Sequence, residues 1–317
     1  MPRRQRGARS RRGCYVPTVK PGAWFVLPTA FAQNGDLDLA SQSRVADAAI
    51  AWGATGLTAL GVMGEAAHLA DDERQAVVET VMSAAGGRVP VLVGCSAQAE
   101  RLVVGFAEQA RLAGASGVMV SAPTLLRNVD LLPGFYERVG AGCQLPVVVQ
   151  DEPNATGVSI PVSVLARSLR AVGSTTVKLE DPPTPPKISR LLEEMPEALV
   201  FGGLGGVSLL AELRRGAGGT MTGFAFPEVM AVIVDAVAAG GFGRAATVFD
   251  RFLPLITFEG QPVVGLAIRK EVLRRRGVLT TGATRGQLRV LDAATCADLD
   301  DVLQRVGLTP GPERLLV

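Results

Sequence analysis

Lys178 is the residue of this chain whose type and position most readily allow chemistry. It is one of four lysines among 32 basic residues, and it follows the β-branched run Thr175-Thr176-Val177. A cation at the end of a buried strand is costly unless its pKa falls or a partner neutralises it. An amine with a depressed pKa is also a nucleophile that forms Schiff bases with carbonyl compounds. A catalytic lysine and a lysine in a structural ion pair both fit these residues.

Glu180 lies two positions beyond Lys178. Because side chains alternate along a strand, the two residues should share one face of it. A carboxylate in that place could hold the amine, or move a proton at the carbon next to an imine. The alternative is a loop carboxylate that caps a helix beginning near Pro185, and the sequence leaves both interpretations open.

Two further segments place polar groups where predicted strands end. Residues 61–65 (Gly-Val-Met-Gly-Glu) join a strand to a helix, and free backbone N–H groups at such joints bind carboxylates or phosphates. Residues 150–152 (Gln-Asp-Glu) follow an apolar strand at 146–149. This second arrangement fits a lined pocket and equally an exposed loop.

The remaining residue types exclude several kinds of site. The single histidine, His68, rules out a histidine-rich metal centre, and we interpret it as structural. The four cysteines have no metal-ligand spacing, so we expect no metal and reduced thiols in a cytoplasmic protein: Cys14, Cys95, Cys143 and Cys296.

The charge of the chain is unevenly distributed. The net charge is +2, but six arginines lie within the first twelve residues, so the rest of the chain is slightly acidic. This excludes a nucleic-acid-binding barrel, and we expect residues 1–20 to form a disordered basic tail. No run of about 18 apolar residues predicts a membrane span, so no membrane partner is expected either.

Short apolar runs alternate with segments of helical periodicity along three quarters of the chain. Strands are predicted at 24–27, 56–60, 90–93, 117–121, 146–149, 175–178, 198–201 and 219–222. Helices are predicted at 39–52, 71–85, 97–113, 130–139, 161–169, 185–194, 207–215 and 228–239. Continuous apolar strands are typical of a parallel sheet buried on both faces.

Eight such units favour an α/β fold of the closed (β/α)8, or TIM, barrel type over an open sheet. We expect the barrel to span 21–240, and 241–317 to pack on it as a C-terminal helical extension with helices at 242–255, 262–275 and 296–306. Active sites of such barrels lie where strands end. That rule selects Lys178 and Glu180 together with Thr29, Gly61, Val62, Met63, Gln150, Gly202 and Met221.

These pieces together resemble the dihydrodipicolinate synthase / N-acetylneuraminate lyase superfamily of class I lyases. The resemblance spans about residues 20–280. Residues 29–31 look like its strand 1 turn, 61–65 like its Gly-x-x-Gly-Glu loop, 153–157 like its Pro-x-x-x-Gly, and Val177-Lys178 like the strand that carries its imine-forming lysine. It implies a 2-oxo acid substrate, no metal and no cofactor, and a homotetramer or homodimer.

Departures from the superfamily pattern narrow the expectation. Gln150 stands where the synthase and the lyase have a Tyr, Val62 and Met63 replace the hydroxyl residues of the strand 2 loop, and Ala155 replaces an Arg. A narrower similarity is with the 2-keto-3-deoxyarabonate dehydratase branch, in residues 149–153 (Val-Gln-Asp-Glu-Pro) and 178–180 (Lys-Leu-Glu). This resemblance implies that the carboxylate two residues beyond the lysine, Glu180, takes part in proton transfer.

The expected function is a Schiff-base lyase, with a dehydratase of a 2-keto-3-deoxy sugar acid favoured. In it, Lys178 attacks the substrate ketone, Glu180 with Gln150 moves the C3 proton, and backbone N–H groups around Val62 and Met63 hold the carboxylate. Gly202 and Met221 shape the pocket. An aldolase, a synthase-like condensation with pyruvate, and a non-catalytic barrel that binds a small acid stay open as alternatives.

Overall fold

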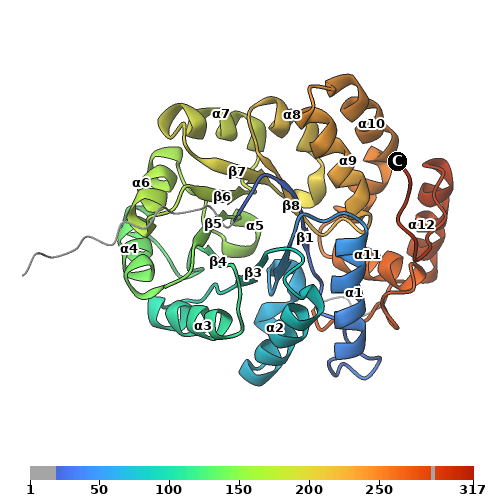
Figure 1. The fold of residues 1–317 in the computed structure, drawn as a ribbon, viewed down its shortest axis with the longest axis horizontal. Coiled ribbons are helices and arrows are strands. Elements are labelled where there is room, and N and C mark those ends of the chain that lie inside the picture. Colours follow the sequence, from blue (N-terminus) through green and yellow to red (C-terminus); the bar gives the residue numbers. More distant parts are fainter. Residues whose placement is uncertain (1–18, 287–289) are drawn as a thin grey trace, which may run out of the picture.

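Eight parallel strands close into a barrel in a computed structural model that describes residues 19–286 and 290–317. The strands pair in chain order, and β1 pairs with β8 (Figure 1). They are β1 (Gly22–Val26), β2 (Gly56–Ala59), β3 (Val91–Gly94), β4 (Gly117–Ser121), β5 (Val147–Asp151), β6 (Thr176–Leu179), β7 (Leu199–Gly202) and β8 (Gly219–Thr222). The predicted (β/α)8 barrel is therefore confirmed, and each predicted strand is present within two residues of its expected ends.

The two faces of these strands build two separate apolar cores. Side chains that point into the barrel form a small central cluster that includes Trp24, Met119, Val148 and Phe201. Side chains that point outward pack with the surrounding helices into a much larger cluster. Burial on both faces explains why the strands are continuous apolar runs in the sequence.

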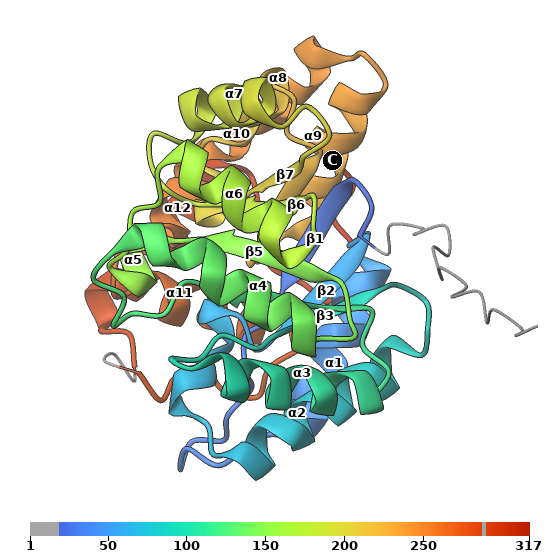
Figure 2. The ribbon, with the colours of Figure 1, turned by 90° about the vertical axis from the view of Figure 1, so that its left-hand side faces the viewer.

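Helices surround the barrel on all sides (Figures 1 and 2). They are α1 (Leu39–Ala51), α2 (Asp71–Ala85), α3 (Glu100–Leu112), α4 (Leu132–Gly142), α5 (Pro153–Thr156), α6 (Val162–Val172), α7 (Thr184–Glu194), α8 (Leu209–Arg214), α9 (Pro227–Ala238), α10 (Phe242–Glu259), α11 (Gly265–Arg275) and α12 (Ala293–Arg305). The sequence missed only the short α5, whose first residue is a proline that suits the start of a helix.

Local signals explain several of these boundaries. The Asp38 side chain accepts a hydrogen bond from the backbone N–H of Ser41 and begins α1. Gly173 ends α6 in the left-handed region, with φ of 73°, which glycine adopts at no steric cost. These short joints bring the carboxyl ends of all eight strands to one face of the barrel.

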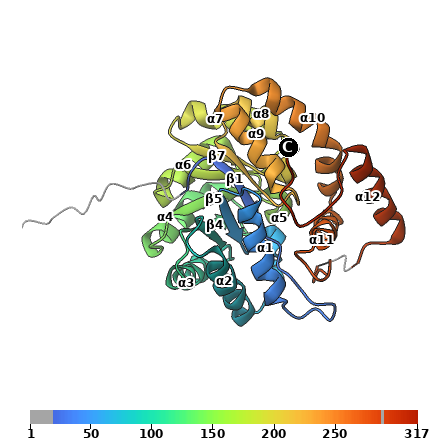
Figure 3. The same ribbon diagram turned by 45° about the vertical axis from the view of Figure 1, so that its right-hand side comes forward.

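The C-terminal helices α10, α11 and α12 lie along one flank of the barrel, with α12 outermost (Figure 3). A buried ion pair connects this extension to the barrel helices. Arg276, just after α11, is 2.7 Å from Glu228 of α9, and both side chains are almost fully buried. The expected tail at 1–20 falls almost entirely outside the described residues, and Val19, which is described, is buried in the central cluster. No helix in the described ranges is long and apolar enough to cross a membrane.

Candidate active site

Lys178 and Glu180 meet at the carboxyl end of β6. The Lys178 Nζ lies 2.9 Å from the Glu180 Oε2, and both side chains are more than nine-tenths buried. The other Glu180 oxygen accepts a hydrogen bond from the backbone N–H of Leu204 at 3.2 Å. Glu180 does not cap α7. This helix runs from Thr184, its N-cap residue is Pro183, and no side-chain capping hydrogen bond is formed there among the described residues.

Gln150 joins this pair from the neighbouring strand. It is directly opposite Lys178 in the β5–β6 register, and its Nε2 donates to the Glu180 Oε2 at 2.8 Å. Asp151 points to the other face, where Lys187 of α7 lies 2.6 Å away. Burial raises the pKa of Asp151 to about 6, against the attraction of Lys187. Alternation along β5 therefore divides the polar segment that follows the valines between the barrel mouth and the helix layer.

A cavity of about 510 Å³ opens above this centre. Five residues predicted for the site line it together with Glu152, namely Lys178, Glu180, Val62, Met63 and Met221. Glu152 belongs to the polar segment 150–152, which the sequence left open between a lined pocket and an exposed loop, and it does line the cavity. Its carboxylate accepts a hydrogen bond from the backbone N–H of Ala155, and burial raises its pKa. The cavity is large enough for a small organic acid.

The turn at 61–65 borders the cavity, and hydrogen bonds to neighbouring residues fix its position. The Thr29 hydroxyl, itself buried, donates to the carbonyl of Gly64 at 2.6 Å, so Thr29 fixes the turn and does not line the cavity. Glu65 adopts the left-handed region and pairs with Lys270 of α11 at 2.5 Å. The first N–H groups of the one-turn helix Val62–Gly64 have no acceptor within a helical turn, so they are available to a ligand.

Gly202 and its neighbour Gly203 let two carboxylates approach the end of β7. A Cβ on Gly202 would lie 1.8 Å from the Oε2 of Glu212, and a Cβ on Gly203 would lie 2.1 Å from the Oε1 of Glu180. Gly202 therefore lies behind the cavity wall, and Gly203 is the glycine that makes room for Glu180. Burial, and then the nearby Glu180 charge, raise the pKa of Glu212 to about 7.

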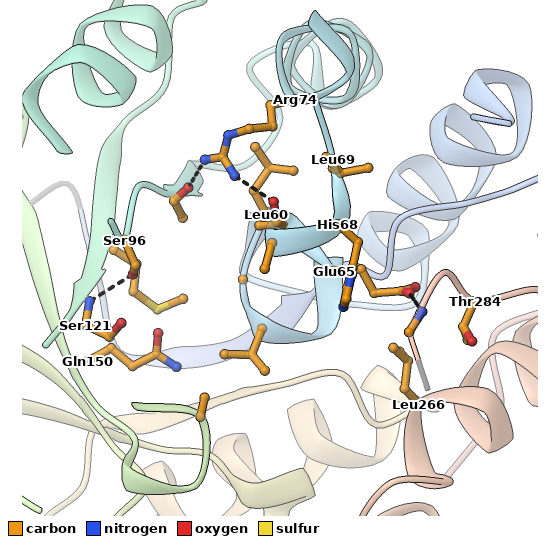
Figure 4. Close-up of a pocket in the computed structure, with 18 of the residues that line it drawn as sticks. Leu60, Glu65, His68, Leu69, Arg74, Ser96, Ser121, Gln150, Leu266 and Thr284 are labelled. Carbon is orange, nitrogen blue, oxygen red and sulfur yellow. Dashed lines mark hydrogen bonds between the residues drawn. The ribbon is translucent and has the colours of Figure 1, made fainter. Parts of the chain in front are cut away.

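Figure 4 shows a second cavity, of about 520 Å³. Gln150 is at one end of it beside Ser96 and Ser121, and Glu65 and His68 are at the other. Gly61 lines it as well. The two cavities share Val62, Val263 and Leu266 as lining residues, so they are neighbouring parts of one mouth.

Backbone strain is concentrated around this mouth. In the described part of the chain, the non-glycine residues with positive φ are Leu60, Glu65, Leu204 and Val263, with φ between 48° and 68°. All four line one of the two cavities. Left-handed conformations are unfavourable for such residues and cluster at functional sites. The backbone thus identifies the same face of the barrel as the side chains do.

The sequence missed two charged residues that come from the C-terminal extension. Arg269 of α11 and Glu259 of α10 line the same cavity as Lys178, and their side chains are 3.6 Å apart. Neither residue follows a barrel strand, so the strand-end rule does not find them. The available signal is that a helical pattern places Arg269 on the apolar face of α11, beside Ile268 and Val272.

Within the described residues, neither a tyrosine nor a metal-binding cluster lies at this site. Tyr136 is buried in α4 and donates its hydroxyl to the carbonyl of Val120 at 2.9 Å, while Tyr15 lies outside the described residues. Among residues 19–286 and 290–317, no three His, Cys, Asp or Glu side chains are arranged to hold a metal ion. The carboxylates that line the cavity with Lys178 are Glu152, Glu180 and Glu259.

An eight-stranded parallel barrel with a buried lysine–carboxylate pair at its carboxyl end has the architecture of a class I lyase, an enzyme that works through a lysine Schiff base. The family model described as "Dihydrodipicolinate synthetase family" matches residues 22–304. The chain belongs to this family and is an enzyme of the class I lyase type.

Individual relatives cover nearly the whole chain. It is 32% identical over 292 residues to an L-2-keto-3-deoxyarabonate dehydratase of Azospirillum brasilense, which covers 90% of this chain and 94% of that protein. It is also 32% identical to the 4-hydroxy-tetrahydrodipicolinate synthase 1 of Streptomyces coelicolor, over 86% of this chain and 90% of that protein. The crystal structure of a dihydrodipicolinate synthase from Rhodopseudomonas palustris superimposes with a TM-score of 0.85 at 32% identity, covering 92% of this chain and 99% of that one.

Proposed function

We propose that this lyase dehydrates a 2-keto-3-deoxy sugar acid through an imine on Lys178. The observation that carries the proposal is the contact between Lys178 and Glu180, at 2.9 Å in the wall of a cavity of about 510 Å³. The similarity to a 2-keto-3-deoxyarabonate dehydratase supports the choice of substrate. Gln150, in the Tyr position of the synthase, supports dehydration over a synthase reaction.

The proposed chemistry balances with the groups present. The Lys178 Nζ attacks C2 of the 2-oxo acid, and loss of one water leaves an imine. Glu180, held by Gln150, takes a proton from C3, which gives an enamine. The enamine expels the C4 hydroxyl, and the same carboxyl returns its proton so that water leaves. Hydrolysis of the remaining imine releases a 2-oxo acid with a double bond between C3 and C4, and frees Lys178.

Aldol cleavage is the second candidate, and it needs a base for the proton of the C4 hydroxyl. Tyr136, the tyrosine in the described part of the chain, is unsuited to that role, because its hydroxyl donates to the carbonyl of Val120 and it lines neither cavity. Glu152 is the remaining carboxylate of the cavity wall near Glu180. Incubation with 2-keto-3-deoxy acids separates the two: a 2-oxo aldehyde or deoxygenated 2-oxo acid indicates dehydration, and pyruvate indicates cleavage.

Borohydride reduction in the presence of pyruvate tests the imine. The expected result is a stable adduct on the peptide that contains Lys178, and its absence in Lys178→Ala. Lys20→Ala is the matched control, since Lys20 is exposed and distant in sequence from the site, and this variant should form the adduct as the wild type does. A wild-type protein that forms no adduct would favour the alternative of a non-catalytic small-acid-binding barrel.

Glu180→Gln separates proton transfer from imine formation. Positioned acid–base groups contribute about 10²–10⁴-fold to a rate, so kcat on the 2-keto-3-deoxy acid should fall by that factor. The amount of pyruvate adduct on Lys178 at equilibrium should change little, because pyruvate trapping does not require loss of the C4 hydroxyl. Full turnover in Glu180→Gln would make Glu180 structural.

We also propose that the protein acts in the cytoplasm as a homodimer or homotetramer. The family resemblance supports the oligomer, and the reduced, unpaired cysteines Cys95, Cys143 and Cys296 are compatible with a reducing compartment. Light scattering coupled to gel filtration measures the oligomeric state, and a monomer at working concentration would overturn that part of the proposal.

A further inference from the structure

Arg269 carries its guanidinium into the wall of the Lys178 cavity from outside the barrel. It is a residue of α11, its side chain is about nine-tenths buried, and it lines the cavity together with Lys178 and Glu180. Arg269 is also buried enough that desolvation lowers its pKa. A cation in such a place requires a stated partner, since isolated buried charges are unfavourable.

The partners that the protein itself supplies are incomplete. The Nε of Arg269 is 3.6 Å from the Glu259 Oε2, which is too long for a hydrogen bond, and the Nε has no other acceptor. The Nη1 donates to the sulfur of Met63 at 3.1 Å, and a thioether is a weak acceptor. Within the described ranges no oxygen accepts from Nη2. The edge of the guanidinium formed by Nη1 and Nη2 is therefore open to a ligand with two acceptor atoms.

Two turns connect the Arg269 guanidinium to the Lys178–Glu180 pair. Glu180, which contacts Lys178, accepts a hydrogen bond from the N–H of Leu204, and the next residue is Gly205. A Cβ on Gly205 would lie 2.8 Å from the Nη2 of Arg269, so the guanidinium packs directly on that turn. On its other side, Nη1 touches Met63 in the turn at 61–65.

The turn at 61–65 offers backbone N–H groups to the carboxylate of a 2-oxo acid, but no positive charge and no hydroxyl. Val62 and Met63 are both apolar. A carboxylate has about four acceptor sites, and two N–H groups leave part of them unpaired and its charge uncompensated. A guanidinium presents a planar fork that matches a carboxylate, and such charged pairs are the strongest hydrogen bonds that proteins make.

We propose that Arg269 binds the C1 carboxylate of the 2-oxo acid and supplies the positive charge that the turn at 61–65 lacks. The inference rests on the proposed imine chemistry and adds a substrate-binding residue to it. Glu259 is then a positioning residue: it faces Nε, and its other contact is a hydrogen bond from the N–H of Ala225 at 3.1 Å. Burial raises the pKa of Glu259 to about 7, and the Arg269 charge opposes that rise.

The test compares two ketones of the same shape, one charged and one neutral. Pyruvate and pyruvamide are each titrated against borohydride trapping on wild type, Arg269→Met and Arg269→Lys. The half-saturating concentration of pyruvate should rise about 10- to 100-fold in Arg269→Met, because hydrogen bonds to charged groups contribute about 1.5–3 kcal/mol. The half-saturating concentration of pyruvamide should change by less than about threefold. For pyruvate, Arg269→Lys should give a value between those of the wild type and Arg269→Met, because lysine keeps the charge but lacks the planar guanidinium.

Two additional variants keep the comparison interpretable. Arg269→Met combined with Glu259→Gln removes both buried charges, so a folded protein is available if the single variant is unstable. Arg305→Met is the control, since Arg305 forms an exposed pair with Asp301 and should leave both ketones unchanged.

Each remaining outcome has a definite meaning. If Arg269→Met weakened the binding of pyruvate and of pyruvamide equally, Arg269 would only support the fold of the site, and the assignment would be rejected. An unchanged pyruvate titration with a weakened 2-keto-3-deoxy acid would move Arg269 to the far end of the substrate and equally reject it. A wild-type protein that traps neither ketone would remove the proposed function itself, and this inference with it.

Discussion

Glu180 is the residue on which the contacts of the candidate site converge. It receives Lys178 and Gln150 on one oxygen and the N–H of Leu204 on the other, and it has room only because Gly203 carries no side chain. Three contacts fix the carboxylate in one orientation, which general acid–base chemistry requires. Removing the space beside Glu180 should therefore damage catalysis more than it damages the fold.

Gly203→Ala tests this space. The added Cβ would lie 2.1 Å from the Glu180 Oε1, so the carboxylate must move and its contact with Lys178 must lengthen. Turnover should fall by at least about tenfold, since misplacement of a catalytic group by 1 Å costs up to about 10² in rate. Gly243→Ala is the control, because this exposed helical glycine has no atom within 4 Å of a new Cβ. Equal turnover of both variants would contradict the role given to Gly203.

Sequence reasoning finds the part of the site that lies along single strands. Lys178 and Glu180 are two positions apart, and Gln150 lies near the end of the neighbouring strand, so alternation and the strand-end rule place all three. Arg269 was not predicted, because its approach to Met63 depends on how α11 packs on the barrel, some 200 positions further along the chain. Contacts of that kind are set by tertiary packing, which local patterns do not encode.

At the scale of elements, Glu212 connects α7, α8 and β7 behind the site. It belongs to α8, accepts a hydrogen bond from Thr184 of α7, and lies against Gly202. Its second oxygen is buried without a partner. Burial, and then the charge of Glu180, raise the pKa of Glu212 to about 7 in the folded protein, above its ordinary value of 4.5.

This raised pKa predicts a pH dependence of stability. Between pH 4.5 and 7 the folded protein binds more protons at Glu212 than the unfolded chain does, so stability falls as the pH rises through this window. Glu212→Gln removes that contribution. The variant should match the wild type at pH 5 and exceed it at pH 8, by on the order of 2 kcal/mol, in urea unfolding. A variant less stable than the wild type at pH 8 would contradict the assignment.

The pair between Lys270 and Glu65 joins α11 to the turn at 61–65. The Lys270 Nζ also donates to the carbonyl of Ala283 and lies 4.5 Å from the ring of Phe31. Lys270→Met leaves Glu65 buried without its counter-charge, and breaking such a pair costs about 3–5 kcal/mol. The variant should unfold at correspondingly lower urea, and because the turn loosens, pyruvate should bind more weakly.

An exposed pair provides the comparison for Lys270→Met. Arg305 and Asp301 are 2.8 Å apart on α12, with both side chains more than half exposed. Arg305→Ala should change stability by no more than about 0.5 kcal/mol. If the two variants lost similar amounts of unfolding free energy, burial would not distinguish these ion pairs, and the structural role assigned to Lys270 would be wrong.

The regular elements were predictable because each carries its own local signal. Helix α2 has its predicted ends at Asp71 and Ala85, and β8 has its predicted ends at Gly219 and Thr222. Continuous burial gives the strands their apolar runs, and one-sided burial gives the helices their period. The short helix α5 and the one-turn helix Val62–Gly64 were missed, since three or four residues are too few to show a period.

At the scale of the whole molecule, the last residues of the chain hold the C-terminal extension to the barrel. The Arg276 guanidinium, which pairs with Glu228, also donates to the carbonyls of Gly311 and Glu313. The indole of Trp52 in the barrel layer packs 3.4 Å from the Arg276 guanidinium, and its Nε1 donates to a carbonyl of the same tail. The tail therefore covers a buried ion pair that would otherwise face water.

A chain that ends at Leu308 should lose this cover. Removal of two hydrogen bonds to a charged group costs at least about 3 kcal/mol, so Tm should fall by roughly 6–12 °C. Imine trapping on Lys178 well below the new Tm should be unaffected, because none of the residues 309–317 lines the cavity that holds Lys178. Leu316→Ser in the full chain is the control, since this side chain is 93% exposed and its loss should shift Tm by less than about 2 °C. If the shortened chain kept its Tm but lost trapping, the tail would belong to the active site, and its role as a cover of the buried ion pair would be wrong.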